Sequence, residues 1–271
     1  MNLLKNIVIP KLSIITINYN NKIGLQTTFD SVFKQSFSDY EYIVIDGEST
    51  DGGQQIIETN ADKISYWVSE KDSGVYHAMN KGIAKASGEY ILFLNSGDHF
   101  ISDTILNEVS VALDGTEIVY GNIFLVEDAS TSWTGVYPDK LSFQHFIDGS
   151  LPHPASFIKK ILFDRVGYYD ESLQICGDWK FFMDAICRYN VGYKHLDKTI
   201  AVFYLDGLSS TADSAQIINT EKESIFQKDY PLFIEMYQQL NKLRTVSNYK
   251  LINRFASIAK MLGLIKFDFK K

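Results

Sequence analysis

Amide and carboxylate side chains follow three short apolar segments, each at the point where the apolar run stops. They are Asn18 and Asn20 after residues 12–17 (LSIITI), Asp46 after residues 42–45 (YIVI), and Asn95 and Asp98 after residues 90–94 (YILFL). Such side chains can bind the base and ribose of a nucleotide, and a carboxylate can hold a divalent cation beside phosphate groups. Because Asp-Gly and Ser-Gly pairs are also common in turns, a purely turn-forming role is the competing interpretation.

The apolar runs alternate with segments of helical periodicity, which is the pattern of an α/β fold with a parallel sheet. We expect strands at residues 12–17, 42–45, 64–68, 90–94 and 117–120, and helices at residues 25–33, 75–86 and 102–113. In an open sheet of this kind, ligands bind beyond the carboxyl ends of the strands. The polar residues that follow the strands should therefore gather at one edge of the sheet.

The second half of the chain is less regular. Residues 122–151 are rich in Ser, Thr, Asp and Gly, and we assign no elements there. Residues 178–189 have the pattern of a helix and residues 199–204 that of a strand, and from residue 214 onward the pattern is helical. The sequence thus predicts a mostly parallel sheet flanked by helices, followed by a helical C-terminal extension.

Charge is spread unevenly along the chain. The 271 residues carry a formal net charge of −7, which argues against a nucleic-acid partner. Residues 241–271 nevertheless hold eight basic residues against one acidic residue, so the remainder of the chain carries −14. Residues 249–267 also show apolar residues near helical spacing. This tail could lie at an anionic membrane surface, or it could pack on the rest of the chain or in a homodimer.

Several classes of protein are excluded or disfavoured. The chain has neither a G-x-G-x-x-G segment after a strand nor a P-loop, so dinucleotide oxidoreductases and P-loop nucleotidases are disfavoured. Its two cysteines, Cys176 and Cys187, fit neither a disulfide framework nor a zinc site. We see no signal peptide and no membrane-spanning run, so we expect a cytoplasmic protein, either free or peripheral on the inner face of the cytoplasmic membrane.

Three segments together resemble glycosyltransferase family 2, in particular its bacterial exopolysaccharide and lipid-linked glycan branch. They are residues 13–20 (SIITINYN), 42–52 (YIVIDGESTDG) and 70–98 (EKDSGVYHAMNKGIAKASGEYILFLNSGD), with a weaker continuation at residues 167–188. The resemblance implies a GT-A type Rossmann-like fold, a nucleotide-diphosphate sugar donor and inversion at the anomeric carbon. Each segment alone is a weak signal, and the ordered set is specific.

By this resemblance, the donor site is formed by residues that follow the first strands or open a later helix: Asn18, Asn20, Asp46, Asp72, Asn80 and Asn95. Asp46 is expected to accept a hydrogen bond from the base, and Asp72 to contact the pyrimidine ring or ribose. For Asp51 we favour a helix cap. Tyr76 and His77 fall on a helix, so core or surface roles are expected and both stay outside the predicted site.

The metal motif departs from the family pattern. Many members carry Asp-x-Asp-Asp after the fourth strand, where this chain reads Asn95-Ser96-Gly97-Asp98. Asp98 is therefore the expected ligand of Mg²⁺ or Mn²⁺, which can take one carboxylate with phosphates and water. His99 is a further neighbour of the metal or diphosphate.

Asp178 is the expected general base, because the resemblance places an acidic residue at the start of this helix. The competing interpretation is a carboxylate that only stabilises the helix start. The usual Glu before it is Gly177 here. Trp179 could stack on a sugar or pack in the core, and His153 could border the acceptor or diphosphate or be an ordinary loop histidine.

The resulting hypothesis is a metal-dependent inverting glycosyltransferase. It would transfer a sugar from a UDP- or dTDP-type donor to a hydroxyl of a lipid-linked glycan acceptor, in polysaccharide biosynthesis. We expect a catalytic domain at residues 1–213, with a nucleotide-binding half at 10–121 and an acceptor half at 122–213, followed by a membrane-associating or dimerising region at 214–271. The alternatives are a sugar-nucleotidyltransferase and a non-catalytic module that binds sugar nucleotides or glycans.

Overall fold

The computed structural model describes residues 9–207, 212–233, 235, 236, 239, 255 and 258. The chain divides into two compact units, Met1–Ile218 and Asn219–Lys271, and the first contains the sheet and every predicted site residue. The boundary predicted at residues 213 and 214 stays a prediction.

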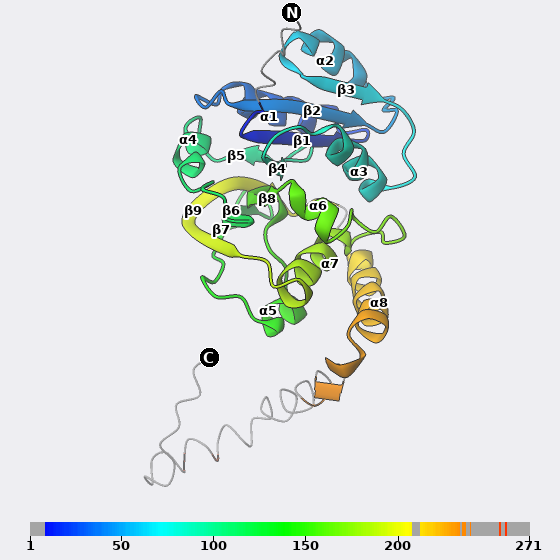
Figure 1. The fold of residues 1–271 in the computed structure, drawn as a ribbon. Helices are drawn as coiled ribbons and strands as arrows, with labels where there is room; N and C mark the ends of the chain where they lie inside the picture. Colours follow the sequence, from blue (N-terminus) through cyan, green and yellow to red (C-terminus); the bar gives the residue numbers. More distant parts are fainter. Residues whose placement is uncertain are drawn as a thin grey trace, which may run out of the picture. The chain divides into compact units, whose positions relative to one another are not determined.

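The amino-terminal half shows the predicted alternation of strands and helices, with α2 and a 3₁₀ turn in addition to the predicted elements. Strands β1 (Leu12–Asn18), β2 (Tyr40–Asp46), β3 (Tyr66–Ser69) and β4 (Tyr90–Phe93) alternate with helices α1 (Lys22–Phe33), α2 (Gly53–Thr59) and α3 (Val75–Lys85) (Figure 1). A short 3₁₀ turn, η1 (Ala61–Lys63), leads into β3. The α/β fold is confirmed.

The remaining strands turn the sheet from parallel to mixed. They are β5 (His99–Phe100), β6 (Ile118–Val126), β7 (Ser132–Gly135), β8 (Ser156–Lys159) and β9 (Tyr193–Tyr204). The sheet order is β3-β2-β1-β4-β8-β6-β9-β5, with β7 paired to β6. Pairs among β1 to β4 are parallel, whereas β8 pairs antiparallel with both β4 and β6. In the second half of the sheet, β6 and β9 pair in parallel.

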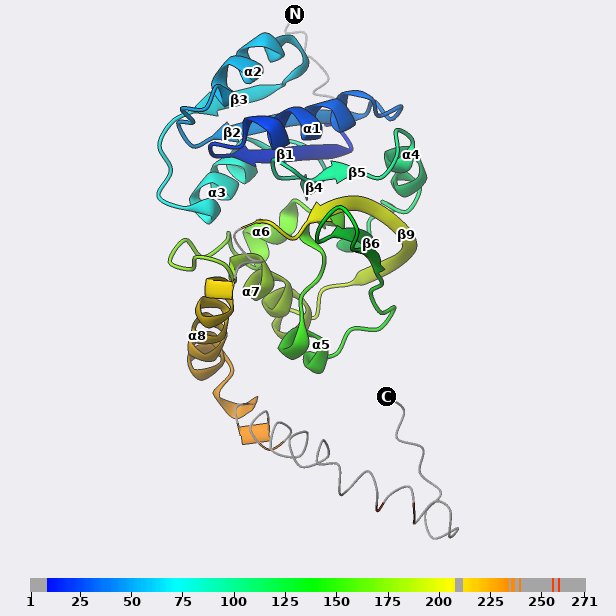
Figure 2. The ribbon, with the colours of Figure 1, turned by 180° about the vertical axis from the view of Figure 1, so that it is seen from behind.

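Helices α1 and α3 cover opposite faces of the parallel strands (Figure 2). Phe29 of α1 belongs to one apolar cluster with Ile14 and Val44 of the strands. The neighbouring strand residue Ile15 lies next to Gly82 of α3. Successive residues of a strand point to opposite faces, so the two helices bury the two faces and leave the strand ends open for function.

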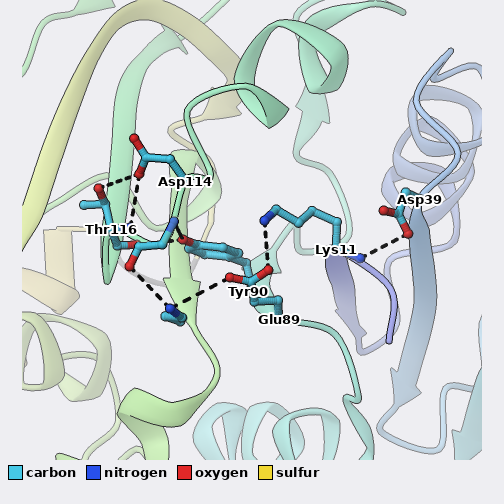
Figure 3. A network of polar contacts seen from close by, with 8 residues as sticks. Lys11, Asp39, Glu89, Tyr90, Asp114 and Thr116 are labelled. Carbon is cyan, nitrogen blue, oxygen red and sulfur yellow. Dashed lines mark hydrogen bonds and ion pairs between the residues drawn. The ribbon is translucent and has the colours of Figure 1, made fainter. Parts of the chain in front are cut away.

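The edge of the sheet opposite the polar loops is tied by a separate polar network (Figure 3). Lys11 Nζ lies 2.8 Å from Glu89 Oε2, and Lys11 N donates to Asp39 Oδ1 at 3.2 Å. Tyr90 Oη donates to Thr116 O at 2.9 Å. These contacts join the amino ends of β1, β2 and β4. The amino ends of the strands are thus held by internal polar contacts, and the predicted site residues lie at the carboxyl ends.

The other helices are α4 (Ile105–Ser110), α5 (Phe143–Asp148), α6 (Ile161–Arg165), α7 (Gly177–Met183) and α8 (Ala212–Asp229), with a 3₁₀ turn, η2 (His153–Ala155). The helix predicted at 178–189 is α7 continued by a π-helical turn, Asp184–Arg188. The end of β6, β7 and α5 occupy the segment in which the sequence predicts no elements. Apart from Phe255 and Ile258, the predicted amphipathic segment 249–267 lies outside the described residues. Among the helices described, none has the length and apolar character to cross a bilayer.

Candidate active site

The carboxylate of Asp46, at the carboxyl end of β2, organises the loop that follows it. Its Oδ1 atom accepts hydrogen bonds from Asn18 Nδ2 at 2.7 Å and Ser49 Oγ at 2.6 Å. Its Oδ2 atom accepts from Ser69 Oγ at 2.6 Å and from Ser49 N at 3.0 Å. Asn18 and Asp46 are register partners in β1 and β2, so the parallel pairing brings two predicted site residues into contact.

Asp46 is fully buried. Burial alone raises the pKa of an acid, but the hydrogen bonds from Ser49, Ser69 and Asn18 lower the pKa of Asp46 below its ordinary value. Since protein groups already bond to both oxygens, a direct contact with a nucleotide base stays a prediction. What the geometry shows is an ionised carboxylate that holds β1, β2 and the loop after β2 together.

Asn20 and Asp51 shape the same loop from its two sides. Asn20 has a φ of 47°, a left-handed conformation that asparagine tolerates, and its Oδ1 accepts from Thr50 N at 2.8 Å. Asp51 accepts from Gly53 N at 2.9 Å and from Lys22 N at 2.7 Å. These two N–H groups belong to the first residues of α2 and α1, so the Asp51 side chain bonds to the start of both helices, although the N-cap residues themselves are Gly52 and Asn21.

Asp72 lies between β3 and α3 and is anchored to that helix. Its Oδ1 is 3.0 Å from His77 Nδ1 and 2.6 Å from Lys81 Nζ. A Cβ atom built on Gly47 would lie 3.4 Å from Asp72 Oδ2, so the loop after β2 faces this carboxylate. His77, which the sequence leaves outside the site, thus contacts a predicted donor-binding residue.

Unsatisfied buried polar atoms concentrate at this edge of the sheet. Among the described residues, five buried side-chain nitrogen or oxygen atoms have no hydrogen-bond partner: Asn18 Oδ1, Asp72 Oδ2, Asn95 Oδ1, His99 Nδ1 and Ser150 Oγ. Four of the five belong to predicted site residues. Leaving such an atom unpaired costs on the order of 1–3 kcal/mol, so these four atoms mark where a polar ligand would bond.

Asp98 is nearly buried and has an acidic neighbour. Burial, followed by the negative charge of Asp206, raises the pKa of Asp98 to about 8, and a backbone hydrogen bond from Asn95 offsets only part of this rise. No group of three or more His, Cys, Asp or Glu side chains in the described part of the chain is arranged to hold a metal. Mg²⁺ and Mn²⁺ take one or two protein oxygens beside phosphate and water, so Asp98 could serve such an ion once its proton is displaced.

His99 extends this acidic end of the site. Its buried Nδ1 has no partner, and its ring centroid lies 5.8 Å from that of Tyr204. Burial lowers the pKa of His99, so the ring is neutral at pH 7. Tyr204 and Asp206 also line a hollow of about 510 Å³ together with residues of the β6–β7 hairpin. The sequence does not single out Asp206, because its link to Asp98 is through space and not through spacing along the chain.

Asp178 is half-buried in the first turn of α7. The N-cap residue of this helix, Cys176, makes no side-chain capping bond. The hydroxyl of Tyr76 donates to Asp178 Oδ1 at 3.0 Å, which joins α3 to α7 across 102 residues of sequence. The charge of Asp178 also raises the pKa of Tyr169, secondary to burial, so the carboxylate faces an aromatic cluster.

Two other predicted residues, Trp179 and His153, are packed in the protein interior. Trp179 is 3% exposed and donates from Nε1 to Phe146 O at 2.7 Å, so its core interpretation is the one that describes the structure. His153 is buried, stacks on Phe93 with ring centroids 4.9 Å apart, and bonds through Nε2 to Tyr169 Oη at 2.9 Å. Its contact with an acceptor or diphosphate stays a prediction.

Asn80 clamps the loop that leads to α7. Its Nδ2 donates to Tyr169 O at 2.9 Å and to Glu171 Oε1 at 2.8 Å, and its Oδ1 accepts from Tyr169 N at 3.0 Å. Both polar atoms of the amide bond to this loop, so we expect an effect of Asn80 on donor binding to act through the loop.

The sequence has informative relatives. The family model for glycosyl transferase family 2 matches residues 13–158. An uncharacterized glycosyltransferase of Mycobacterium tuberculosis is 36% identical over 180 residues, which cover 65% of this chain and 69% of that protein. A PGL/p-HBAD biosynthesis glycosyltransferase of Mycobacterium bovis is 27% identical over 210 residues, or 74% of this chain and 80% of that protein.

The fold also matches solved structures. S. aureus TarS 1-349 in complex with UDP-GlcNAc has a TM-score of 0.63 and 21% identity, covering 81% of this chain and 67% of that chain. The mannosyltransferase PcManGT from Pyrobaculum calidifontis, in complex with GDP-Man and Mn²⁺, has a TM-score of 0.57 and 16% identity, covering 96% of this chain and 82% of that chain. At these identities the likeness is one of fold.

Proposed function

Because the chain belongs to glycosyl transferase family 2, we propose that this glycosyltransferase moves one sugar from a UDP- or dTDP-type donor to a hydroxyl of a glycan acceptor, with inversion. The observation that carries the proposal is the set of unpaired buried atoms at the carboxyl edge of the sheet: Asn18 Oδ1, Asp72 Oδ2, Asn95 Oδ1 and His99 Nδ1.

The chemistry of these atoms suits the nucleoside part of such a donor. Asn18 Oδ1 and Asp72 Oδ2 can only accept hydrogen bonds, and a pyrimidine N–H and ribose hydroxyls can donate them. Asp46 would contribute indirectly, because its hydrogen bonds hold Asn18 and the loop after β2 in place.

A divalent metal fits the acidic end of the site. Asp98 would hold Mg²⁺ or Mn²⁺ in its ionised form, which the positive charge of the cation would stabilise against the effects of burial and of Asp206. When bound, the ion would neutralise charge on the departing diphosphate. Asn95 and His99 border the same place and could orient phosphate oxygens.

Asp178 would be the general base for the acceptor hydroxyl. Inversion needs a base on the face of the sugar opposite the diphosphate. Asp178 comes from α7, in the half of the domain that follows the nucleotide-binding strands, and its carboxylate is half-buried among Tyr76, Tyr169 and His153.

A lipid-linked acceptor in cell-surface polysaccharide synthesis is the class that best accounts for the charge pattern. Residues 241–271 carry a net +7 on an otherwise acidic chain, which would favour the inner face of the cytoplasmic membrane. The name of one relative, a PGL/p-HBAD biosynthesis glycosyltransferase, also supports work on cell-envelope glycans.

Calorimetric titration with UDP-GlcNAc, a dTDP-sugar and GDP-mannose, each with Mn²⁺, tests the donor class. The expected result is selective binding of a pyrimidine nucleotide sugar that weakens by at least about tenfold in Asp72→Asn, because one acceptor of a charged hydrogen bond is lost. Lys71→Ala, an exposed neighbour, is the control. Binding of none of the donors, or equal binding by Asp72→Asn, would contradict the proposal.

A further inference from the structure

Tyr76 is a buried side chain that meets the proposed general base, and the function proposed above gives it no role. It lies in the first turn of α3 and is 4% exposed. Its hydroxyl lies between the carbonyl oxygen of Ile175 and Oδ1 of Asp178, to both of which it can donate. One phenol hydroxyl therefore bridges the backbone before α7 and the carboxylate within it.

Gly177 makes room for this ring. A Cβ atom at Gly177 would lie 2.7 Å from both Cε2 and Cζ of Tyr76, closer than real Cβ atoms approach other atoms. The ring centroid of Tyr76 also lies 5.6 Å from that of Tyr169. The tyrosine on α3 and the glycine on α7 thus fit as a pair, and a larger residue at position 177 would displace the phenol.

The Tyr76 hydroxyl lies at the start of α7 and stays protonated, so it can act as a hydrogen-bond donor there. Burial, followed by the charge of Asp178, raises the pKa of Tyr76 well above its ordinary value, so the phenol keeps its proton at neutral pH. Its O–H is therefore available to donate to Oδ1 of Asp178 in the first turn of α7.

We propose that Tyr76 is a positioning residue for Asp178: its O–H fixes Oδ1 and so aims Oδ2, to which none of the described residues donates, at the acceptor hydroxyl. In the transfer step the acceptor O–H bond breaks and its proton moves to Oδ2. The acceptor oxygen bonds to the anomeric carbon as the bond from that carbon to the diphosphate oxygen breaks. This inference rests on the proposed function, which supplies the reaction.

One helix would then set both ends of the reaction. Asp72, a predicted donor-binding residue, is held to α3 by His77 and Lys81. Asp178 is held to the same helix by Tyr76. Because a helix is a rigid spacer, α3 would fix where the base stands relative to the donor.

Tyr76→Phe is the direct test, because it removes the hydroxyl and keeps the ring against Gly177. We expect kcat for transfer to fall by about tenfold or more, while donor Kd changes less than about twofold. In an Asp178→Asn background the same change should have no further effect on kcat, since Tyr76 acts through that carboxylate. Tyr120→Phe is the matched control: Tyr120 is buried and donates to a backbone carbonyl, Pro138 O, at 2.6 Å outside the site.

A second measurement does not depend on turnover. The ¹³C chemical shift of the Asp178 carboxyl carbon, recorded in the folded protein at pH 7, should change in Tyr76→Phe and stay the same in Tyr120→Phe, because only the first variant loses a hydroxyl that donates to Oδ1 of Asp178. The other titratable groups that face Asp178 are His153 and Tyr169, and both are unchanged in this variant.

The outcomes separate the two proposals. An unchanged Asp178 carboxyl resonance, a kcat within twofold of wild type, or an equal loss in the Asp178→Asn background would overturn the role of Tyr76. A wild-type protein that transfers no sugar, with the carboxyl resonance still changing in Tyr76→Phe, would overturn the proposed function and leave the positioning contact standing.

Discussion

At the scale of single residues, the site contains two kinds of buried carboxylate. Asp46 has four hydrogen bonds from protein groups, so it is satisfied before any ligand arrives. Asp72 has one oxygen paired with α3 and the other buried without a partner. The first kind maintains the shape of the site, and the second is available to a ligand. Mutations of the two should therefore differ in what they damage.

Asp46→Asn should destabilise the fold, and by an amount that depends on pH. The folded pKa of Asp46 is lowered, so its ionised form stabilises the protein above the ordinary aspartate pKa, and this contribution disappears as the pH falls through the folded pKa. At pH 7 we expect a loss of about 2–3 kcal/mol in the free energy of unfolding, measured in urea. The loss should shrink below pH ~4. An equal loss at pH 3 and pH 7, or a loss as large in exposed Asp62→Asn, would rule out this account.

Asp178→Asn should remove the base and leave donor binding intact. Asparagine keeps the shape and accepts the bond from Tyr76 but cannot take a proton, so transfer should fall by about 10²–10⁴-fold. Radiolabelled sugar transfer gives the rate, and calorimetry gives donor Kd.

The control for this variant is Asp164→Asn, an exposed carboxylate in the first turn of α6. If Asp178 only stabilised its helix, both variants would transfer sugar within a few-fold of wild type, since asparagine is a good residue at helix starts.

Asp98→Asn should abolish the response to metal. Mn²⁺ with UDP should raise the melting temperature of the wild-type protein by mass action, and EDTA should reverse the rise. In Asp98→Asn the melting temperature with UDP should be the same with and without Mn²⁺, because the charged ligand is lost. Exposed Asp103→Asn should behave as wild type. A full Mn²⁺ response in Asp98→Asn would show that the metal is held elsewhere.

At the residue scale, strand pairing brings predicted residues together only where they lie in register. Asn18 and Asp46 are register partners at the ends of β1 and β2, whereas Asp98 lies in the loop beyond the last registered pair of β4. Tyr76 and Asp206 could not be found in this way, since each meets its partner through contacts between elements far apart in sequence. A tryptophan can either pack in a core or stack on a sugar, so the sequence alone does not distinguish the two roles of Trp179. Its burial in the structure indicates the packing role.

At the scale of elements, some strands can also be predicted from local sequence, and others depend on contacts between distant segments. Continuous apolar runs predict β1, β2 and β4, because parallel strands are buried on both faces. The antiparallel strands are different: β8 contains four residues and owes its place to pairing with both β4 and β6. Its sequence carries no local signal of that position. The mixed half of the sheet therefore follows from tertiary pairing.

Gly82→Ala tests how closely α3 must pack on the sheet. A Cβ at Gly82 would lie 2.6 Å from Ile15 Cγ2, so the helix would have to move away from β1. We expect a loss of about 1–3 kcal/mol in the free energy of unfolding. Because α3 anchors Asp72 and Tyr76, donor Kd and kcat should both worsen. Gly149→Ala is the control, since the nearest atom to its Cβ would be at 3.7 Å. A neutral Gly82→Ala would mean that the helix can shift without cost.

At the scale of the whole molecule, charge separates the chain into two parts. Residues 1–240 carry a net −14 and residues 241–271 a net +7. An acidic protein is repelled by an anionic membrane surface unless a local basic segment offsets this, and each basic residue near such a surface contributes about 1 kcal/mol. The sequence reveals this asymmetry without a structure, because net charge needs no coordinates.

Deleting the residues after Ser247 should therefore abolish binding to anionic vesicles. The full-length protein should co-sediment with phosphatidylserine vesicles, less with neutral ones, and less again in high salt, because screening weakens the attraction. A full-length variant with Lys250→Glu, Arg254→Glu and Lys260→Glu keeps the length and apolar residues of the tail and should bind as weakly as the truncated protein. If the tail instead packs in a homodimer, truncation would halve the mass seen in sedimentation equilibrium and leave vesicle binding unchanged. That outcome would reject the membrane role, because the positive charge of the tail would then interact with the acidic part of a second copy of the chain.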